Sequence, residues 1–265
     1  MIETTIFNLL LYASTLLCLG SFAALFSIRW PRTNQYLAEK EAHEILSQKF
    51  TRACPKSISF GRSQCMHCLH SLSWKDTIPL ISFILLRGQC RYCSHSISPR
   101  YWAIEALFLI VCLPLFFLCS STYQLLLTTL IISSLLMAAI IDYEHQLIPN
   151  ECCGLAIAAA FFLNIGTVNL DSSVLGAIFG YGMIYLLREL YLHFRNTEGI
   201  GLGDAKLLAV LGAWLYVDHL FTTLLYASLL GILYTAVCHK KERQNIPFGP
   251  FLTLSGIAHF YYIQL

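Results

Sequence analysis

Long apolar runs constrain the fold of this chain more than any other feature. They follow one another along most of the 265 residues, and mostly short polar breaks separate them. A helix needs about 20 apolar residues to cross the hydrocarbon core of a bilayer. Only 12% of the residues are charged, whereas soluble domains average about 25%. The pattern therefore predicts an all-α polytopic membrane protein.

The apolar runs predict eight transmembrane helices with a large insertion between the first two. The first is expected to be a retained span, because Met1–Asn8 contains no basic residue whereas Arg29 and Arg32 follow the apolar run. The expected spans lie at about 5–28, 102–119, 123–141, 152–169, 173–194, 204–217, 218–237 and 247–265. We expect three parts: a first helix (1–28), a cysteine-containing insertion (29–101) and a membrane domain (102–265).

The distribution of basic residues predicts the orientation in the membrane. The insertion holds 11 of the 17 Lys and Arg residues, and the other six fall on the same side of an eight-span arrangement. The opposite connections, near 120–123, 169–173 and 217–219, contain none. Because cytoplasmic loops are enriched in Lys and Arg, we expect a cytoplasmic insertion and both termini outside. Topology accounts for the basic excess, so nucleic-acid binding is not expected.

Four of the 11 cysteines form a pattern typical of a metal site. Cys65 and Cys68 are separated by two residues, as are Cys90 and Cys93, and 21 residues lie between the pairs. Two such pairs of thiolates complete a tetrahedral zinc site, so the insertion is expected to resemble a zinc ribbon. Two disulfides or a redox role are the alternatives, and a reducing cytoplasm argues against disulfides. Three nearby histidines are weaker ligand candidates: His67, His70 and His95.

Two aspartates are expected to meet at the cytoplasmic membrane face. Asp142 closes one apolar run and Asp204 opens another, with two predicted spans between them. A carboxylate in a membrane helix costs about 2.5–3.5 kcal/mol, so it is rarely present without a function. Glycines at 199, 201 and 203 would allow a substrate strand or a helix to approach Asp204 closely. The alternative for either aspartate alone is a helix cap or a solvated loop residue.

Several ordered motifs resemble one family, the type IV prepilin peptidases, which combine leader cleavage with N-methylation. The resemblance covers nearly the whole chain. It is carried by Gly20–Phe22, the four cysteines, Leu86–Cys93, Ile97–Tyr101 with Glu105, the Asp142 segment through Pro149, GLGDAKLLAVLGAW (201–214) and Ile246–Phe251.

The resemblance implies an intramembrane aspartic endopeptidase of the bacterial inner membrane, with Asp142 and Asp204 as the catalytic pair. It implies cleavage after a glycine, between a short basic leader and the apolar helix of a prepilin or a type II secretion pseudopilin. The family then methylates the new N-terminus from S-adenosylmethionine. No motif in this sequence identifies the residues that bind this cofactor, and the substrates and the oligomeric state cannot be read from it.

Three other functions compete with this interpretation. A presenilin-like or preflagellin protease would use the same chemistry without the cysteine module. A proton-coupled transporter would use Asp142 and Asp204 as a relay, although transport sites usually lie near the membrane midplane. A zinc scaffold without activity would tolerate Asn at both aspartates.

Overall fold

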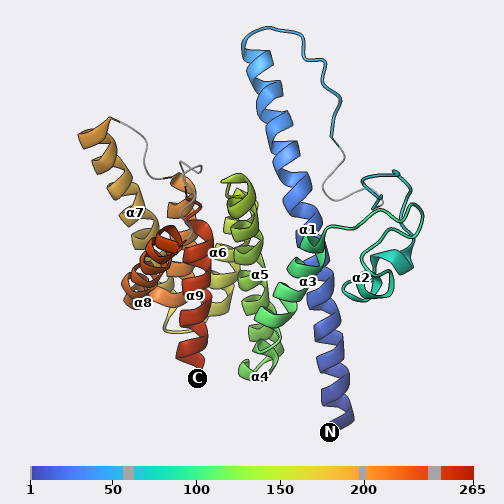
Figure 1. Ribbon diagram of the computed structural model, residues 1–265. Helices are drawn as coiled ribbons and strands as arrows, with labels where there is room; N and C mark the ends of the chain where they lie inside the picture. The colour runs from blue at the N-terminus through green and yellow to red at the C-terminus, as the bar shows by residue number, and fades with distance from the viewer. Residues whose placement is uncertain (1, 56–62, 197–200, 238–245) are drawn as a thin grey trace. The chain divides into compact units, whose positions relative to one another are not determined.

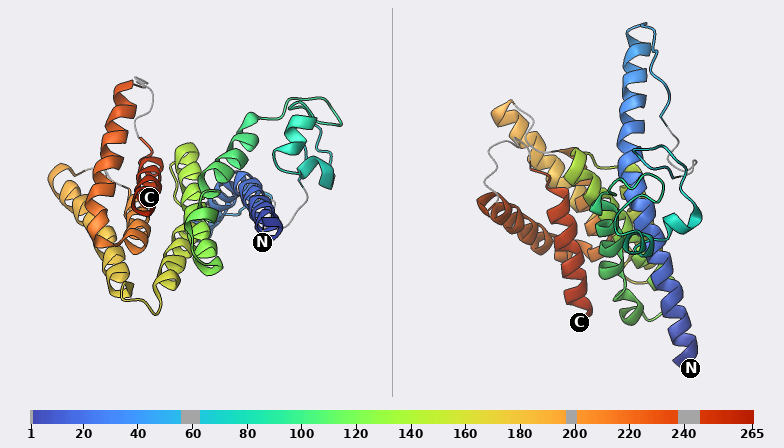
Figure 2. Two further views of the ribbon diagram at one scale, coloured as in Figure 1. Left: turned by 90° about the horizontal axis from the view of Figure 1, so that it is seen from below. Right: turned by 45° about the vertical axis from the view of Figure 1, so that its right-hand side comes forward.

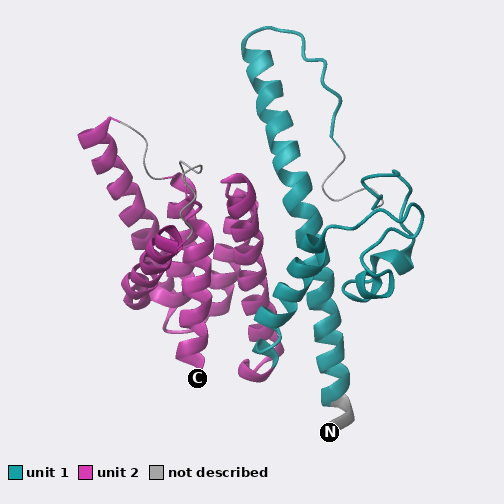
Figure 3. Cartoon of the chain, viewed as in Figure 1, with its two compact units in different colours: residues 1–116 teal, residues 117–265 magenta. Residues whose placement is uncertain are grey.

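The computed structural model describes residues 2–55, 63–196, 201–237 and 246–265, and all its regular elements there are helices (Figure 1). Contacts divide the chain into unit 1, residues 1–116, and unit 2, residues 117–265 (Figure 3). The helices are α1 (Ile2–Ile45), η1 (Trp74–Thr77), α2 (Ile81–Leu85), α3 (Pro99–Cys112), α4 (Leu115–Leu118), α5 (Thr122–His145), α6 (Asn150–Asn164), α7 (Leu170–Arg195), α8 (Leu202–Val237) and α9 (Gly249–Gln264). The predicted three-part division of the chain stays a prediction.

Five helical segments are long and apolar enough to cross a membrane, which confirms the multi-pass character predicted from the sequence. They are Thr5–Ile45, Pro99–Leu118, Thr122–His145, Leu170–Arg195 and Leu202–Val237. Helices α6 and α9 are apolar but have only 15 and 16 residues. The count of eight spans is not confirmed by helix length alone.

Unit 1 is organised around one very long helix, the blue α1 in Figures 1 and 2. Its 44 residues span about 66 Å, roughly twice the thickness of the hydrocarbon core. The sequence suggested that the first span ends near residue 28, but the helix continues through Pro31 to Ile45. Proline is tolerated in membrane helices when neighbouring groups satisfy the freed backbone. Arg100 of α3 donates to the Ala24 carbonyl and to Ser27 Oγ, and so ties α3 to the part of α1 that precedes Pro31. The carbonyl that loses its helical partner at Pro31 is that of Ser27.

Helices α1 and α3 pack closely within unit 1. A Cβ on Gly20 would lie 2.8 Å from Glu105 Cα, so the two backbones approach too closely for a larger residue. The hydroxyl of Tyr12 donates to the Cys112 carbonyl over 3.0 Å near the other end of the contact. Glu105 is buried in this interface, with 8% of its surface exposed.

The chain reverses direction within α8, at Tyr216, whose φ of 65° is not helical. Before Tyr216, residues of α8 meet α9 in parallel order: Leu207 with Gly249, Leu211 with Gly256 and Trp214 with Phe260. After Tyr216 the order is antiparallel: His219 with His259, Thr223 with Ser255 and Gly231 with Phe251. Both halves of α8 therefore run along α9, in opposite directions. The division into two membrane spans, 204–217 and 218–237, stays a prediction.

Glycines allow α7 and α8 to cross at backbone contact. A Cβ on Gly176 of α7 would overlap the carbonyl of Gly212 in α8, and a Cβ on Gly212 would overlap that of Gly176. Ser173 adds a hydrogen bond from its hydroxyl to the Ala213 carbonyl. Close approach of this kind is how membrane helices gain packing energy without a hydrophobic driving force.

We predict that Gly212→Ala destabilises unit 2 by about 1–3 kcal/mol, because the added methyl group can be accommodated only by separating two backbones. Thermal unfolding in detergent measures the effect. The matched control is Gly182→Ala in α7, where nothing lies within 4 Å of the new Cβ. Equal stability of the two variants would contradict the close crossing.

Candidate functional site

Asp142 lies buried near the end of α5, with 6% of its surface exposed. Its Oδ2 accepts a hydrogen bond of 2.9 Å from the backbone N–H of Gly249, the first residue of α9. Helix α5 ends shortly afterwards, where Gln146 adopts a left-handed conformation and its N–H donates to the Asp142 carbonyl. The side chain is thus held between the end of one helix and the beginning of another.

Asp204 lies in the first turn of α8, and this turn packs against the segment that follows Asp142. A Cβ on Gly203 would lie 2.8 Å from Ile148 Cδ1. Lys206 Nζ donates to Asn150 Oδ1 over 2.6 Å, which links α8 to the start of α6. These contacts hold the turn of Asp204 next to the loop that leaves α5.

Gly249 lies against both aspartate-bearing helices, because its N–H donates to Asp142 and a Cβ there would lie 3.0 Å from Leu207 Cδ1, three residues after Asp204. The turns that carry Asp142 and Asp204 therefore lie together at one end of unit 2. Their role as a catalytic pair at the cytoplasmic face stays a prediction. The neighbouring Glu144 and His145 are exposed. Gly199 lies outside the described residues. Two like charges in a poorly solvated place favour a state in which the pair shares one proton, and such a pair can activate a water molecule.

The fit of Gly249 against Asp142 was not foreseen from the sequence. A Cβ at this position would lie 2.7 Å from Asp142 Oδ2 and 3.0 Å from Leu207 Cδ1. Glycine is needed here because the backbone must come within hydrogen-bonding distance of the carboxylate. The segment from Pro247 to Pro250 was seen only as part of the resemblance. Its local signal is a glycine between an aromatic residue and a helix-starting proline.

We predict that Gly249→Ala lowers the rate of any reaction at this carboxylate pair by about 10²-fold, because a displacement of about 1 Å is enough for such a loss. Protein yield and thermal stability should change much less. Gly154→Ala in α6 is the control, since nothing lies within 4 Å of its new Cβ. Full activity of Gly249→Ala would show that this contact does not position Asp142.

The four predicted cysteines form one compact cluster in unit 1. The Sγ atoms of Cys65, Cys68, Cys90 and Cys93 all lie within 4.8 Å of one another. Cys65 Sγ and Cys93 Sγ are 3.8 Å apart. Four sulfur atoms at about 2.3 Å from a tetrahedral zinc ion are separated by about 3.8 Å, so the donor set and its geometry fit zinc. Hydrogen bonds from the backbone N–H groups of Cys68 and His67 lower the pKa of Cys65 to about 6, so one thiolate forms readily. The His95 N–H favours the Cys93 thiolate, but burial and hydrogen bonding with the other cysteines outweigh it and raise the pKa of Cys93.

The cluster is built from two copies of one short motif, an internal repeat that the sequence analysis missed. The segments QCMHCLHS (64–71) and QCRYCSHS (89–96) share Gln, both cysteines, His and Ser. In each, the N–H of the first cysteine donates to the carbonyl of the shared histidine, and flanking residues pair as an isolated bridge. The histidine rings lie outside the sulfur cluster: His67 stacks on His95, and His70 lies against Tyr92 with the two ring planes tilted by 34°.

Asp76 ties η1 to the second cysteine turn, a role that no sequence pattern indicated. Its Oδ1 accepts from Arg91 Nε over 2.7 Å, and its Oδ2 accepts from the Ser73 hydroxyl and from Tyr92. Burial opposes ionisation, but the hydrogen bonds from Ser73 and the Arg91 guanidinium outweigh it and hold the pKa of Asp76 below its usual value. Since Arg91 and Tyr92 lie between Cys90 and Cys93, Asp76 orients the turn that carries two candidate ligands.

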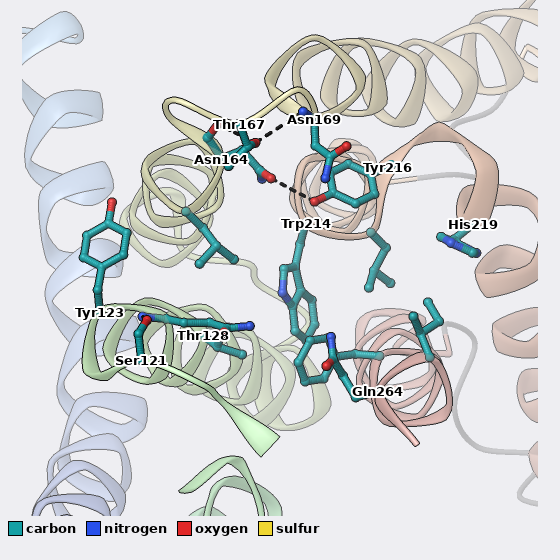
Figure 4. Close-up of a pocket in the computed structure, with 15 residues that line it drawn as sticks. Ser121, Tyr123, Thr128, Asn164, Thr167, Asn169, Trp214, Tyr216, His219 and Gln264 are labelled. Atoms are coloured by element: carbon teal, nitrogen blue, oxygen red, sulfur yellow. Dashed lines mark hydrogen bonds between the residues drawn. The ribbon is translucent and has the colours of Figure 1, made fainter. Parts of the chain in front are cut away.

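A cavity of about 370 Å³ lies at the other end of unit 2, where α5 begins and α8 reverses (Figure 4). The Tyr216 hydroxyl donates to Asn164 Oδ1 in its wall. Neither Asp142 nor Asp204 lines it. The cavity is therefore separate from the carboxylate pair.

The fold and these residues define a class: a multi-pass helical membrane protein with a carboxylate pair in one unit and a four-cysteine cluster in the other. Residues 15–119 match the model of the bacterial peptidase A24 N-terminal domain, and residues 129–236 match that of the type IV leader peptidase family. No solved structure matches the chain.

Similar curated proteins cover most of the chain. A prepilin leader peptidase/N-methyltransferase of Dichelobacter nodosus is 34% identical over 83% of this chain and 75% of the relative. A type 4 prepilin-like proteins leader peptide-processing enzyme of Escherichia coli O78:H11 is 32% identical over 92% of this chain and 90% of the relative. A Pseudomonas putida relative with the same name as the first is 30% identical over 91% and 85%. The chain belongs to the type IV leader peptidase family, and the transporter alternative is not supported.

Proposed function

We propose that this protein removes the short basic leader peptide from type IV prepilins and pseudopilins of type II secretion, after a glycine, and then methylates the new N-terminus. Family membership supports both activities. The observation that carries the proteolytic assignment to particular residues is the pairing of Asp142 with Asp204 at one end of unit 2.

In the proposed reaction the aspartates work as one unit. The ionised carboxylate takes a proton from a water molecule as the oxygen attacks the scissile carbonyl carbon. The protonated carboxyl group donates a hydrogen bond to the carbonyl oxygen and later a proton to the leaving amine, as the C–N bond breaks. Because a coupled pair titrates as a unit, the roles are not divided between Asp142 and Asp204. The N–H of Gly249 would hold the Asp142 carboxyl group in place throughout the reaction.

The proposed topology brings the substrate to this pair. Eight spans in a bacterial inner membrane, with both termini periplasmic, would place the aspartates at the cytoplasmic face. A prepilin has a basic leader on that side and an apolar helix in the bilayer, so the bond between them would lie beside the two carboxyl groups. The reversal of the chain at Tyr216 supports this arrangement, because it lets two spans form within α8.

The four cysteines are proposed to hold a structural zinc ion. Four thiolates fill a tetrahedron, so no position stays open for a reacting water molecule, and the ion would fold the insertion rather than do chemistry. S-adenosylmethionine, which the methyltransferase activity implies, would supply the methyl group. No residue of this chain is assigned to binding it.

The test is incubation of the purified protein in lipid with a prepilin, followed by mass measurement of the product. With S-adenosylmethionine, the mass should correspond to loss of the leader and gain of one methyl group. Without it, cleavage should continue and the product should carry a free amine. A full-length product would overturn the proposed function, and cleaved but unmethylated product in ample cofactor would reduce it to a peptidase.

A further inference from the structure

The short helix α2 exposes an apolar face that no described part of unit 1 covers. Ile81, Ile84 and Leu85 occupy positions i, i+3 and i+4, and their exposed fractions are 52%, 64% and 76%. Phe83 points the other way and packs on Gly88. The three apolar side chains thus form one face of a helix at the surface of unit 1.

A hydrogen bond from Leu80, the residue before α2, attaches the start of α2 to α3, a candidate membrane span. The N–H of Leu80 donates to Glu105 Oε2 over 2.8 Å. Glu105 lies six residues after Pro99, where α3 and its candidate membrane span begin, which is about 9 Å along the helix. The backbone at Leu80 is therefore held beside the second turn of that span, and α2 follows directly.

The conformation of Leu80 indicates that this attachment is specific. Its φ of 57° and ψ of −48° are unusual for a residue with a side chain, so this conformation costs free energy. The bond to the buried Glu105 carboxylate offsets that cost.

Basic and aromatic side chains flank the apolar face. Arg87 follows α2 and is exposed. Lys75 lies over the ring of Trp74, which is 72% exposed, on the preceding helix η1. The one acidic residue of these two helices, Asp76, is already paired with Arg91. Cationic heads and a Trp ring beside apolar side chains are typical of helices that lie in the interface of an anionic bilayer.

We propose that α2 inserts Ile81, Ile84 and Leu85 into the membrane interface, with Lys75 and Arg87 at the phosphates of anionic lipids. The proposal requires a membrane protein but not the proposed catalytic activity. Because Gly88 and Cys90 follow α2 directly, insertion of α2 would hold the cysteine cluster at the membrane surface and keep it out of bulk solution.

Tryptophan fluorescence in vesicles of phosphatidylcholine and phosphatidylglycerol tests the proposal. The full chain carries Leu85→Trp, with Trp30, Trp74, Trp102 and Trp214 changed to Phe. Lipids with brominated acyl chains should quench this variant several-fold more strongly than they quench a matched Ile45→Trp variant. Ile45 is 83% exposed at the end of α1, far beyond the length of one span, so aqueous acrylamide should quench the matched variant preferentially.

Two results would overturn the proposal. One is acrylamide quenching of the Leu85→Trp variant as strong as that of the Ile45→Trp variant. The other is protection of the Leu85→Trp variant from acrylamide only after a prepilin is added, which would make the face a protein-binding surface.

The unmodified protein gives an independent measurement, in case the substituted chain does not fold. Trypsin added to the exposed side of the vesicles should cleave after Lys49, which is exposed beside the end of α1, much faster than after Arg87. Ile84→Ser with Leu85→Ser should speed cleavage after Arg87 while zinc content stays unchanged. Equal rates at Lys49 and Arg87 in the native chain would contradict insertion.

Discussion

Asn in place of either Asp142 or Asp204 is expected to lower leader cleavage by at least about 10⁴-fold while the protein still inserts and folds. Asn preserves size and hydrogen bonding, including the bond that Asp142 accepts from Gly249, but it cannot exchange a proton with water. Since the reaction needs one ionised and one protonated carboxyl group, loss of either partner disables the pair. The double variant should therefore be little worse than either single variant. Initial rates with a purified prepilin measure the loss.

Asp171→Asn is the matched control, because Asp171 is an exposed carboxylate in the first turn of α7 and has no proposed role. It should retain full activity. Substantial cleavage by Asp142→Asn would remove Asp142 from the mechanism, and the same holds for Asp204. Additive losses in the double variant would show that the two residues act independently.

Ser at Cys65, Cys68, Cys90 or Cys93 is expected to remove zinc and unfold the insertion. One ion per chain is expected in the native protein, since the four sulfurs form one site. Structural zinc contributes about 10–16 kcal/mol of binding energy, which is also folding energy. Loss of one ligand should therefore destabilise the whole insertion. Metal analysis and protease sensitivity of residues 63–98 measure the two effects. Methylation is expected to fall at least as much as cleavage.

Cys54→Ser is the matched control in the same insertion, because Cys54 is exposed and lies outside the cluster. It should keep its zinc and its resistance to protease. A native protein without metal, or cysteines that react with alkylating reagents only after reduction, would contradict the zinc site and favour disulfides.

The extent to which the sequence predicted the structure differs between helices. The apolar runs indicated the helical class, and the break near residue 217 coincides with the reversal at Tyr216. The first membrane span was predicted to end near residue 28, and α1 continues beyond that point as one helix through Pro31 to Ile45. Local propensity could not show that Arg100, far away in the chain, would bond to Ala24 and Ser27 of α1.

The candidate sites show the same division. The spacing of four cysteines was enough to predict their cluster, because two closely spaced pairs leave few ways to arrange four thiolates. The pairing of Asp142 and Asp204 was predicted from the number of spans between them. Neither pattern could indicate Gly249, Asp76 or Leu80, because their roles depend on which distant residue each one touches.

By itself, then, the sequence determined that this is a multi-pass membrane protein and which four cysteines cluster, since both follow from composition or short spacing. The tertiary structure alone decided which backbone N–H holds Asp142, why position 249 must be glycine, and how Glu105 draws α2 to the level of a membrane helix. The physical reason is that a hydrogen bond between segments 25 or 107 residues apart leaves no periodic trace in either segment. Only packing determines that they meet.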